Sequence, residues 1–398
     1  MHLMIGEQRR LDQPDTFAHD TLIYRLPKML DALIKDQPWN AETKEKLNQI
    51  HQVFPHRSPV QFIDDGPSNE EWNRRISTVK HKTFLEIPII FSECYFYRKI
   101  LEATGYFKTG SPFYHFDPFH YKKEPEFEEN LRLFQQLIDC FEEEIVKTGF
   151  NGRSLEALFR LNLTGNQADL STDHPELENT VSMERLFKQV LLINDAPAIM
   201  PKFRKKMRQI DIITDNAGVE LFCDFLMADY FLRNSMAARV IFHLKPYPIF
   251  VSDAMTGDVK MLLDFLHRNM DANLICLGER IDNYFQTGQI VSTEFPFWNL
   301  PVNFREVKTS LEKEFGGSEL VICKGDANYR RFFDDLIWPD HSEPAEILTY
   351  FPAPVLFLRI IKSEVLAAEM VVDRDILDKT FRQWPLEPHG MIQYSNKD

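Results

Sequence analysis

The stretch RQIDIITDNAGVELFCDFLMADYFL, residues 208 to 232, decides the fold because it joins two kinds of apolar periodicity. The short β-branched run from Ile210 to Thr214 predicts a buried strand, and the spacing that follows is typical of a helix. Between them lie Asp215 and Asn216, a carboxylate and an amide at the end of a strand. In open α/β sheets, ligands bind beyond the carboxyl ends of the strands, so we expect both side chains to face a site.

The C-terminal half repeats this rhythm of strand and helix. The apolar runs IDIIT, ARVIFHL, ANLICLG, ELVICKG and VLFLRII alternate with longer amphipathic segments, which predicts an α/β fold with a largely parallel sheet covered by helices. Before residue 200 the apolar residues recur mostly at helical spacing. The polar segment 163–182 is the expected connection, so we predict a mostly helical N-terminal domain over residues 1–185 and an α/β domain over residues 186–398.

The composition limits the classes of function. The net charge of −14, from 60 acidic and 46 basic residues, argues against tracking a nucleic-acid backbone but permits a local basic pocket for a small anion. The five scattered cysteines are typical of reduced core residues. Because there is no signal-peptide core and no window of about 20 apolar residues, we expect a cytoplasmic protein without a membrane or nucleic-acid partner. The oligomeric state stays open.

Polar residues also follow the other predicted strands. Asp253 follows YPIFV, the cluster KGDANYRR (324–331) follows ELVI, and Arg359 and Lys362 come at the end of the last run. Two acids and an amide suit a hard divalent cation, and nearby cations suit a phosphate. Taken alone, each cluster is more often a helix cap or a solvated loop, and for the pair Asp215 and Asn216 the odds of a turn or cap are about three to one. Their coincidence at the strand ends of one sheet favours a site.

A second candidate metal site lies in YHFDPFHYKK, which contains His115, Asp117 and His120. Its aromatic surroundings favour a packed loop instead.

Several blocks together resemble a known family. IDIITDNAGVELFCDFLMADYFL, LKPYPIFVSDAM, FWNLP, VICKGDANYRR and LRIIKSE occur in an order and spacing similar to the metal-dependent damage-control phosphatase family, formerly domain of unknown function 89. The sequence is most similar to the sugar-phosphate phosphatase branch, which includes the acidic residue methyltransferase-like proteins. The similarity extends upstream through LNLTGNQADLS, LLIND and ECYFYRKI. The resemblance implies an N-terminal helical domain on a three-layer α/β/α sandwich, with a divalent metal at the carboxyl edge of the sheet.

The resemblance also implies residue roles. The metal ligands are Asp215, Asn216 and Asp253, with Glu220 nearby. The expected substrate-binding residues are Asp215, Asn216, Glu220, Asp326, Asn328, Tyr329, Arg330 and Lys362, and Lys324 is a further cation available to a phosphate. The branch usually has Arg-Thr-x-Lys near its C-terminus, whereas this chain has Ile360 at the threonine position.

These roles predict a metal-dependent phosphatase for small sugar phosphates of the fructose 1-phosphate or fructose 6-phosphate type, in a damage-control role. The expected cofactor is Mn²⁺, Mg²⁺, Co²⁺ or Ni²⁺, and the expected catalytic residues are Asp215, Asp253 and Asp326. Attack by water is favoured because DIITDN lacks the Asp-x-Asp-x-Thr arrangement of aspartyl-phosphate enzymes, although Asp215 or Asp253 as nucleophile stays open.

Two alternatives come from other classes. The first is an S-adenosylmethionine-dependent protein carboxyl (glutamate) methyltransferase, against which DNAGVE offers one glycine where a nucleotide-binding turn normally needs several. The second is a noncatalytic binding protein, which would be marked by loss of a ligand acid. The chain retains these acids.

Overall fold

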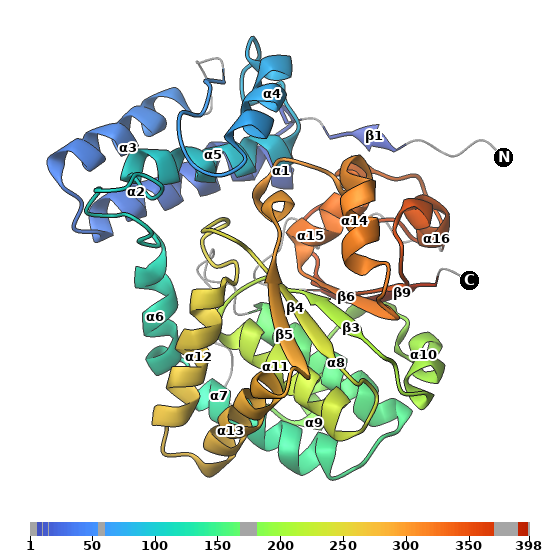
Figure 1. Cartoon of the computed structure of the whole chain (residues 1–398). Helices are drawn as coiled ribbons and strands as arrows, with labels where there is room; N and C mark the ends of the chain where they lie inside the picture. The colour runs from blue at the N-terminus through green and yellow to red at the C-terminus, as the bar shows by residue number, and fades with distance from the viewer. Residues whose placement is uncertain are drawn as a thin grey trace.

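The central feature of the fold is a seven-stranded sheet with the order β2-β9-β8-β6-β3-β4-β5 (Figure 1). The structure is a computed structural model that describes residues 6–9, 11–14, 16–54, 60–167, 181–369 and 389–396. Neighbouring strands are parallel except β8 and β9, which confirms the expected α/β fold with a largely parallel sheet. The strands of this sheet are β2 Leu191–Asn194, β3 Ile210–Ile213, β4 Val240–Leu244, β5 Ile290–Glu294, β6 Leu320–Lys324, β8 Val355–Ile360 and β9 Gly390–Ser395.

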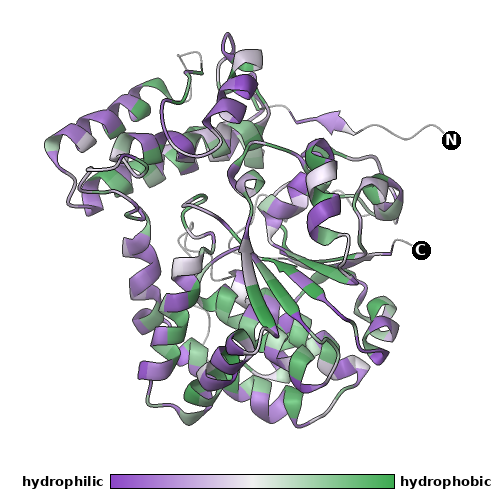
Figure 2. Cartoon of the chain, viewed as in Figure 1, coloured by the Kyte–Doolittle hydropathy of each residue, from purple (hydrophilic) through white to green (hydrophobic). Residues whose placement is uncertain are grey.

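The central strands are buried on both faces, as their apolar composition requires (Figure 2). In β6, Val321 and Cys323 join one hydrophobic cluster, whereas Leu320 and Ile322 join the other. This alternation is the two-residue period of a strand, and it places one core on each side of the sheet.

Helices cover the two faces and extend beyond one edge. Figure 1 shows α2 to α5 gathered on one side of the molecule and α7, α8, α11 and α13 on the opposite side. The helices are α1 Phe17–Asp20, α2 Leu26–Asp36, α3 Ala41–Val53, α4 Asn69–Val79, α5 Ile89–Thr104, α6 His120–Glu129, α7 Leu131–Asp139, α8 Gly152–Gln167, α9 Met183–Leu186, α10 Ala196–Ile199, α11 Gly218–Arg233, α12 Thr256–Arg268, α13 Ala272–Gln286, α14 Lys308–Phe315, α15 Asp326–Phe332 and α16 Pro344–Ile347. Within the described residues, no helix is both long and apolar enough to cross a bilayer.

Shorter elements complete the chain. Thr21–Arg25 (η1) and Cys140–Val146 (η2) are π-helical, and β1 Glu7–Gln8 pairs with β7 Leu336–Ile337. The 3₁₀ turns are η3 Met200–Arg204, η4 Pro296–Asn299, η5 Phe304–Val307 and η6 Leu348–Tyr350.

One predicted strand is wrong. The run ANLICLG begins helix α13, because the Asp271 side chain accepts hydrogen bonds from the backbone N–H groups of Asn273 and Leu274 and so caps a helix. Leu274, Leu277 and Ile281 are then buried at helical spacing. The strands β2, β5 and β9 of this sheet were not predicted.

The expected connection between domains is only partly visible. Residues 163–167 continue helix α8, and residues 168–180 lie outside the described residues. The boundary at residue 185 stays a prediction.

The strand order creates a crevice at one place. From β3 the chain moves outward through β4 to β5, and it then returns to β6 on the other side of β3. The connections after β3 and β6 therefore diverge at the carboxyl edge, which is where open α/β sheets bind ligands. Asp215 and Asp326 follow these two strands.

Candidate active site

A pocket opens at this crevice, and six residues predicted from the sequence line it. They are Asp215, Asn216, Asp253, Asp326, Arg330 and Lys362. Side chains from the N-terminal half complete the wall, namely Phe17, Thr21, Arg25, Leu26, Met29, Glu93 and Tyr97. The pocket therefore lies between the sheet and the N-terminal helices.

Backbone pairing brings the predicted metal ligands together. Asn216 and Asp253 form an isolated antiparallel bridge. Ala217 N donates to Ser252 O at 2.7 Å, and Ala254 N donates to Asp215 O at 2.8 Å. The Ser252 hydroxyl donates to Asn216 Oδ1 at 2.6 Å. The loops after β3 and β4 are thus joined directly at the three candidate ligands.

The turn before Asp253 has an unusual backbone. Phe250 and Val251 both line the pocket and have φ values of 51° and 71°. A β-branched residue such as Val251 rarely adopts the left-handed region, and such strain is typical of functional sites held by surrounding structure. This turn directs Ser252 and Asp253 toward Asp215 and Asn216.

The environment of Asp215 favours a bound cation. Burial, followed by the negative charges of Glu220 and Asp253, raises the pKa of Asp215 well above its ordinary value, and Lys362 and Lys245 only partly oppose this. A divalent cation between these carboxylates would offset their repulsion.

A close approach by the backbone also supports the position of Asp215. Gly325 has a φ of 79°, and a Cβ atom there would lie 2.0 Å from Asp215 Oδ2. Only glycine therefore gives the Asp215 carboxylate room beside the loop after β6.

The donor set fits a hard ion. Two carboxylates and one amide provide oxygen ligands, which Mg²⁺ and Mn²⁺ prefer. The described residues contain no group of three or more His, Cys, Asp or Glu side chains that could hold a metal, so the proposed ligand set depends on the amide of Asn216. The residues present are therefore suitable for a Mg²⁺-like ion.

Asp326 presents an acceptor to the pocket. Its Oδ1 accepts hydrogen bonds from Lys362 N at 3.0 Å and Ser363 N at 3.2 Å, and it lies 2.8 Å from Arg359 Nη2. Burial alone would raise the pKa of Asp326, but Arg359, Arg330 and the backbone donors outweigh it and lower the pKa. Its buried Oδ2 has no hydrogen-bond partner within the described residues, so it can accept a hydrogen bond from a ligand.

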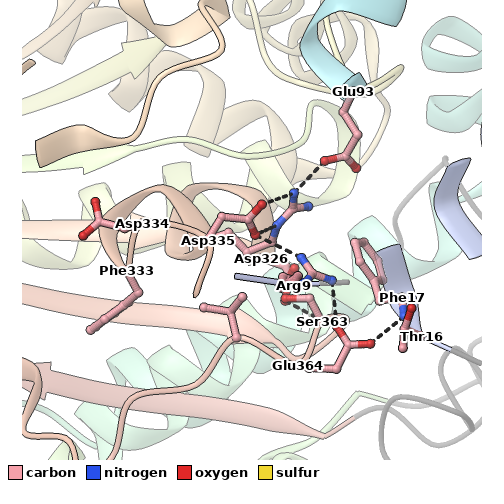
Figure 3. Close-up of polar contacts among 12 residues, drawn as sticks. Arg9, Thr16, Phe17, Glu93, Asp326, Phe333, Asp334, Asp335, Ser363 and Glu364 are labelled. Atoms are coloured by element: carbon pink, nitrogen blue, oxygen red, sulfur yellow. Dashed lines mark hydrogen bonds and ion pairs between the residues drawn. The ribbon is translucent and has the colours of Figure 1, made fainter. Parts of the chain in front are cut away.

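Arg330 belongs to an ion-pair network that crosses the pocket wall. Its guanidinium lies 2.6 Å from Glu93 and 2.9 Å from Asp335. Arg9 joins Asp335 at 3.0 Å and Glu364 at 2.6 Å. Dashed lines in Figure 3 mark the ion pairs of this network among Arg9, Glu93, Asp335 and Glu364. The network connects the N-terminal segment, helix α5, helix α15 that begins at Asp326, and the loop that carries Lys362.

Lys245, which the sequence analysis missed, supports the metal ligands. Its Nζ lies 3.3 Å from Asp253 Oδ2 and donates to Thr214 O at 3.2 Å. Lys245 directly follows β4, so the expectation that site residues lie beyond the carboxyl ends of the strands could have identified it. Asn166 of α8 was also missed. Its Nδ2 donates to Asp215 Oδ2 at 3.2 Å and to Glu220 Oε2 at 2.7 Å.

Four of the expected substrate-binding residues lie behind the pocket lining, namely Glu220, Lys324, Asn328 and Tyr329. Lys324 Nζ is fully buried and pairs with Glu220 at 2.7 Å and Asp224 at 2.9 Å, so its charge is neutralised beneath the sheet edge. Glu220 in turn accepts from Asn216 Nδ2 at 2.8 Å and orients that amide.

Asn328 and Tyr329 also support the loops from behind. Asn328 Nδ2 donates to Thr214 O and Lys324 O, at 3.0 and 2.9 Å. The Tyr329 hydroxyl donates to Gln393 Oε1 at 3.0 Å.

Ile360, at the position where the branch usually has threonine, belongs to the core. Its side chain is fully buried in the cluster beneath the sheet, and its N–H donates to Asn166 Oδ1 at 3.0 Å. The side chain therefore points away from the pocket.

The alternative metal site in the loop before α6 is a set of structural contacts. Asp117 pairs with Lys123 at 3.1 Å, His120 lies 3.2 Å from Glu124, and His115 stacks on Tyr106. These side chains are engaged by other residues of the protein, but Tyr114, His115 and Phe116 are exposed, so the loop is only partly packed.

Comparison with known proteins identifies the family. Residues 10–377 match the family described as damage-control phosphatase ARMT1-like domain. Damage-control phosphatase ARMT1 of Xenopus laevis is 28% identical in an alignment that covers 96% of each chain. The protein of the same name from Macaca fascicularis is 30% identical in an alignment that covers 88% of this chain and 89% of that protein.

A solved structure shows the same fold. The crystal structure of a DUF89 family protein from Pyrococcus horikoshii aligns over 100% of both chains, with a TM-score of 0.51 and 14% sequence identity. The sequence match over most of the chain and this common fold together show that the chain belongs to the damage-control phosphatase ARMT1-like family and is a phosphatase.

Proposed function

We propose that the protein is a divalent-metal-dependent phosphatase that hydrolyses small sugar phosphates of the fructose 1-phosphate or fructose 6-phosphate type, in a damage-control role. The observation that carries this proposal is the bridge that joins Asn216 to Asp253 beside the buried Asp215 carboxylate. Mn²⁺, Mg²⁺, Co²⁺ or Ni²⁺ would be held by these three side chains. When bound, the ion supplies positive charge for the phosphoryl oxygens and lowers the pKa of an attacking water.

The chain's own residues bind and orient the phosphate. Lys362 lines the pocket and acts electrostatically on Asp215, so its ammonium group is the cation that we assign to the nonbridging phosphoryl oxygens. Arg330 is already paired with two carboxylates. We therefore give it the supporting role of keeping Asp326 ionised.

Asp326 is suited to a hydroxyl group. Because its pKa is lowered, it is a carboxylate at neutral pH and can only accept hydrogen bonds. Its Oδ2 would accept from a sugar hydroxyl or from the water that attacks phosphorus while the bond to the sugar oxygen breaks. Tyr97 and Phe250, whose ring centroids lie 5.4 Å apart, form an apolar side of the pocket that limits water.

The methyltransferase alternative has less support. The glycine of DNAGVE, Gly218, lies under the Glu126 side chain, and a Cβ atom there would be 1.7 Å from Glu126 Oε2. The space beside this glycine is therefore filled by a protein carboxylate and is not open to a nucleotide.

The test is release of inorganic phosphate from a panel of sugar phosphates that includes fructose 1-phosphate and fructose 6-phosphate. We expect chelation to abolish release, and added Mn²⁺, Mg²⁺, Co²⁺ or Ni²⁺ to restore it. Release that is insensitive to chelators would contradict the metal role, and hydrolysis confined to phosphates without a sugar would contradict the substrate class. Stoichiometric binding of S-adenosylmethionine in calorimetry would favour the alternative.

A further inference from the structure

Helix α6 makes two contacts with the loops that carry the candidate metal ligands. Lys123 and Glu126 are three residues apart, so they lie on one face of the helix, and both are 1% exposed. Lys123 Nζ donates to the backbone carbonyl of Asp253 at 3.1 Å. Glu126 Oε1 accepts from Val219 N, at the start of α11, at 3.0 Å. One helix of the N-terminal half therefore contacts both loops of the metal site.

The Lys123 ammonium group is fully engaged. Besides Asp253 O, it pairs with Asp117 at 3.1 Å and with Asp258 at 2.9 Å, and an ammonium group has three donors. Asp258 also accepts from Met255 N at 2.8 Å, at the start of α12. Lys123 therefore ties α6 to the short segment between Asp253 and α12.

Glu126 provides a cap that the local sequence lacks. The residue before α11 is Ala217, which has no side chain able to cap a helix. The Glu126 carboxylate of helix α6 caps α11 instead. It lies at the N-terminus of α11, where the positive end of the helix dipole favours a negative charge. The positive φ of Gly218 and its missing Cβ leave the space that this carboxylate occupies.

We infer that Lys123 and Glu126 are positioning residues for the metal site. Lys123 holds the Asp253 loop, and Glu126 holds the start of α11 that follows Asp215 and Asn216. Neither touches a reacting group, and each acts through the ligands whose backbone it fixes. This inference rests on the proposed function, since it requires that the three ligands bind a metal ion.

The first experiment measures Mn²⁺ binding directly, by electron paramagnetic resonance of free Mn²⁺, on folded Lys123→Met. The variant should bind Mn²⁺ about 10- to 100-fold more weakly, which is the usual cost of losing a partner that orients a metal ligand. At saturating metal its KM for substrate should stay near the wild-type value. A dissociation constant equal to that of the wild type would overturn the inference.

A matched control separates positioning from general stability. Arg280 pairs with Asp229 at 2.9 Å and Glu142 at 2.7 Å. Asp229 lies eleven residues beyond Gly218 on α11, roughly 16 Å along the helix. Arg280→Met should lower the melting temperature without changing Mn²⁺ affinity. If it weakens Mn²⁺ binding as much as Lys123→Met does, the effect is one of stability and the inference is wrong.

A pair of Glu126 variants tests the second contact and replaces Lys123→Met if that protein does not fold. Glu126→Gln keeps an oxygen that can accept from Val219 N, so Mn²⁺ affinity should stay within about threefold of wild type. Glu126→Ala should lose about tenfold. Equal losses of Mn²⁺ affinity in both variants would show that the negative charge of Glu126 matters and its hydrogen bond to Val219 N does not, which would overturn the positioning role. Absence of Mn²⁺ binding by the wild type would instead contradict the proposed function.

Discussion

The two walls of the pocket are built in different ways. The sheet wall consists of buried polar residues at strand ends, and Asp215, Asn216 and Asp253 are fixed there by backbone pairing. The N-terminal wall comes from the helical elements α1, η1, α2 and α5, and α1 and η1 contribute Phe17, Thr21 and Arg25. We propose that the sheet wall holds the groups for phosphoryl chemistry, whereas the N-terminal wall shapes the space for the rest of the substrate.

The largest effect should follow a change in the sheet wall. Asp253→Asn removes one charge from the metal site but keeps a neutral oxygen ligand. At limiting metal, activity should fall by more than about 1000-fold, the upper range for loss of one electrostatic contact, and it should partly recover as metal is added. Steady-state kinetics across a metal titration measure this.

Asp195→Asn is the control for the same substitution. Asp195 accepts from Tyr394 N at 2.9 Å beside β9, and it should tolerate the change without a shift in metal dependence. If both variants lost activity in the same metal-dependent way, Asp253 would have no special role in metal binding, and the comparison of the two walls would fail.

Lys362→Met should separate phosphate binding from metal binding. The loss of an ammonium group beside the phosphoryl group should raise KM and lower kcat, with a combined cost of about 2 to 4 kcal/mol in kcat/KM. Metal affinity should stay near the wild-type value. KM and kcat values close to wild type would show that Lys362 does not bind the phosphate. Recovery of activity on addition of metal would show that Lys362 instead supports the metal ligands.

The N-terminal wall should have a smaller effect, limited to substrate binding. Arg25 lies on the π-helical turn η1, and its guanidinium carbon is 5.3 Å from the centre of the Phe17 ring. Arg25→Met keeps the apolar stem but removes the charge. Because Arg25 is partly exposed, KM should rise about fivefold, near 1 kcal/mol, with kcat unchanged.

Lys28→Met is the matched control for Arg25. It removes a cation one helical turn further along the chain, at a residue outside the pocket lining, and its KM should match the wild type. A loss of kcat in Arg25→Met would assign chemistry to the N-terminal wall and contradict the comparison.

The smallest expected effect is on the pH dependence of stability, and it comes from His243, which lies beneath the sheet wall. His243 of β4 is buried and lies 2.8 Å from Asp211 through Nε2, while its Nδ1 has no partner within the described residues. Burial lowers the pKa of His243, although Asp211 opposes this. The unfolded chain therefore binds more protons than the folded chain just below pH 6.5, and stability is lost as the pH falls through this range.

His243→Gln keeps a donor for Asp211 but does not titrate. Its melting temperature should fall less steeply than that of the wild type as the pH is lowered from about 7 to 5. Parallel slopes for the two proteins would show that His243 does not contribute to the pH dependence.

The same difference between the walls explains what the sequence could predict. The position of Asp215, Asp253 and Asp326 follows from a general rule about parallel strands, because each directly follows an apolar run or its turn. The strand alternation could also have corrected Lys324, which shares its face of β6 with Leu320 and Ile322 rather than with the pocket.

The N-terminal contributions could not be predicted in this way. Arg25 and Lys123 are ordinary charged residues of helical segments, and only tertiary packing brings them to a site more than 80 residues away in sequence. The run ANLICLG shows a further limit. Its apolar residues fit a strand or a buried helix, and the Asp271 cap decides for the helix.

The most direct test of the central claim is a crystal structure of the protein grown with Mn²⁺ and measured for anomalous scattering. The account predicts one anomalous peak between Asp215, Asn216 and Asp253, with oxygen distances of roughly 2.0 to 2.3 Å. Absence of a peak at these residues, at Mn²⁺ concentrations that support phosphate release, would contradict it.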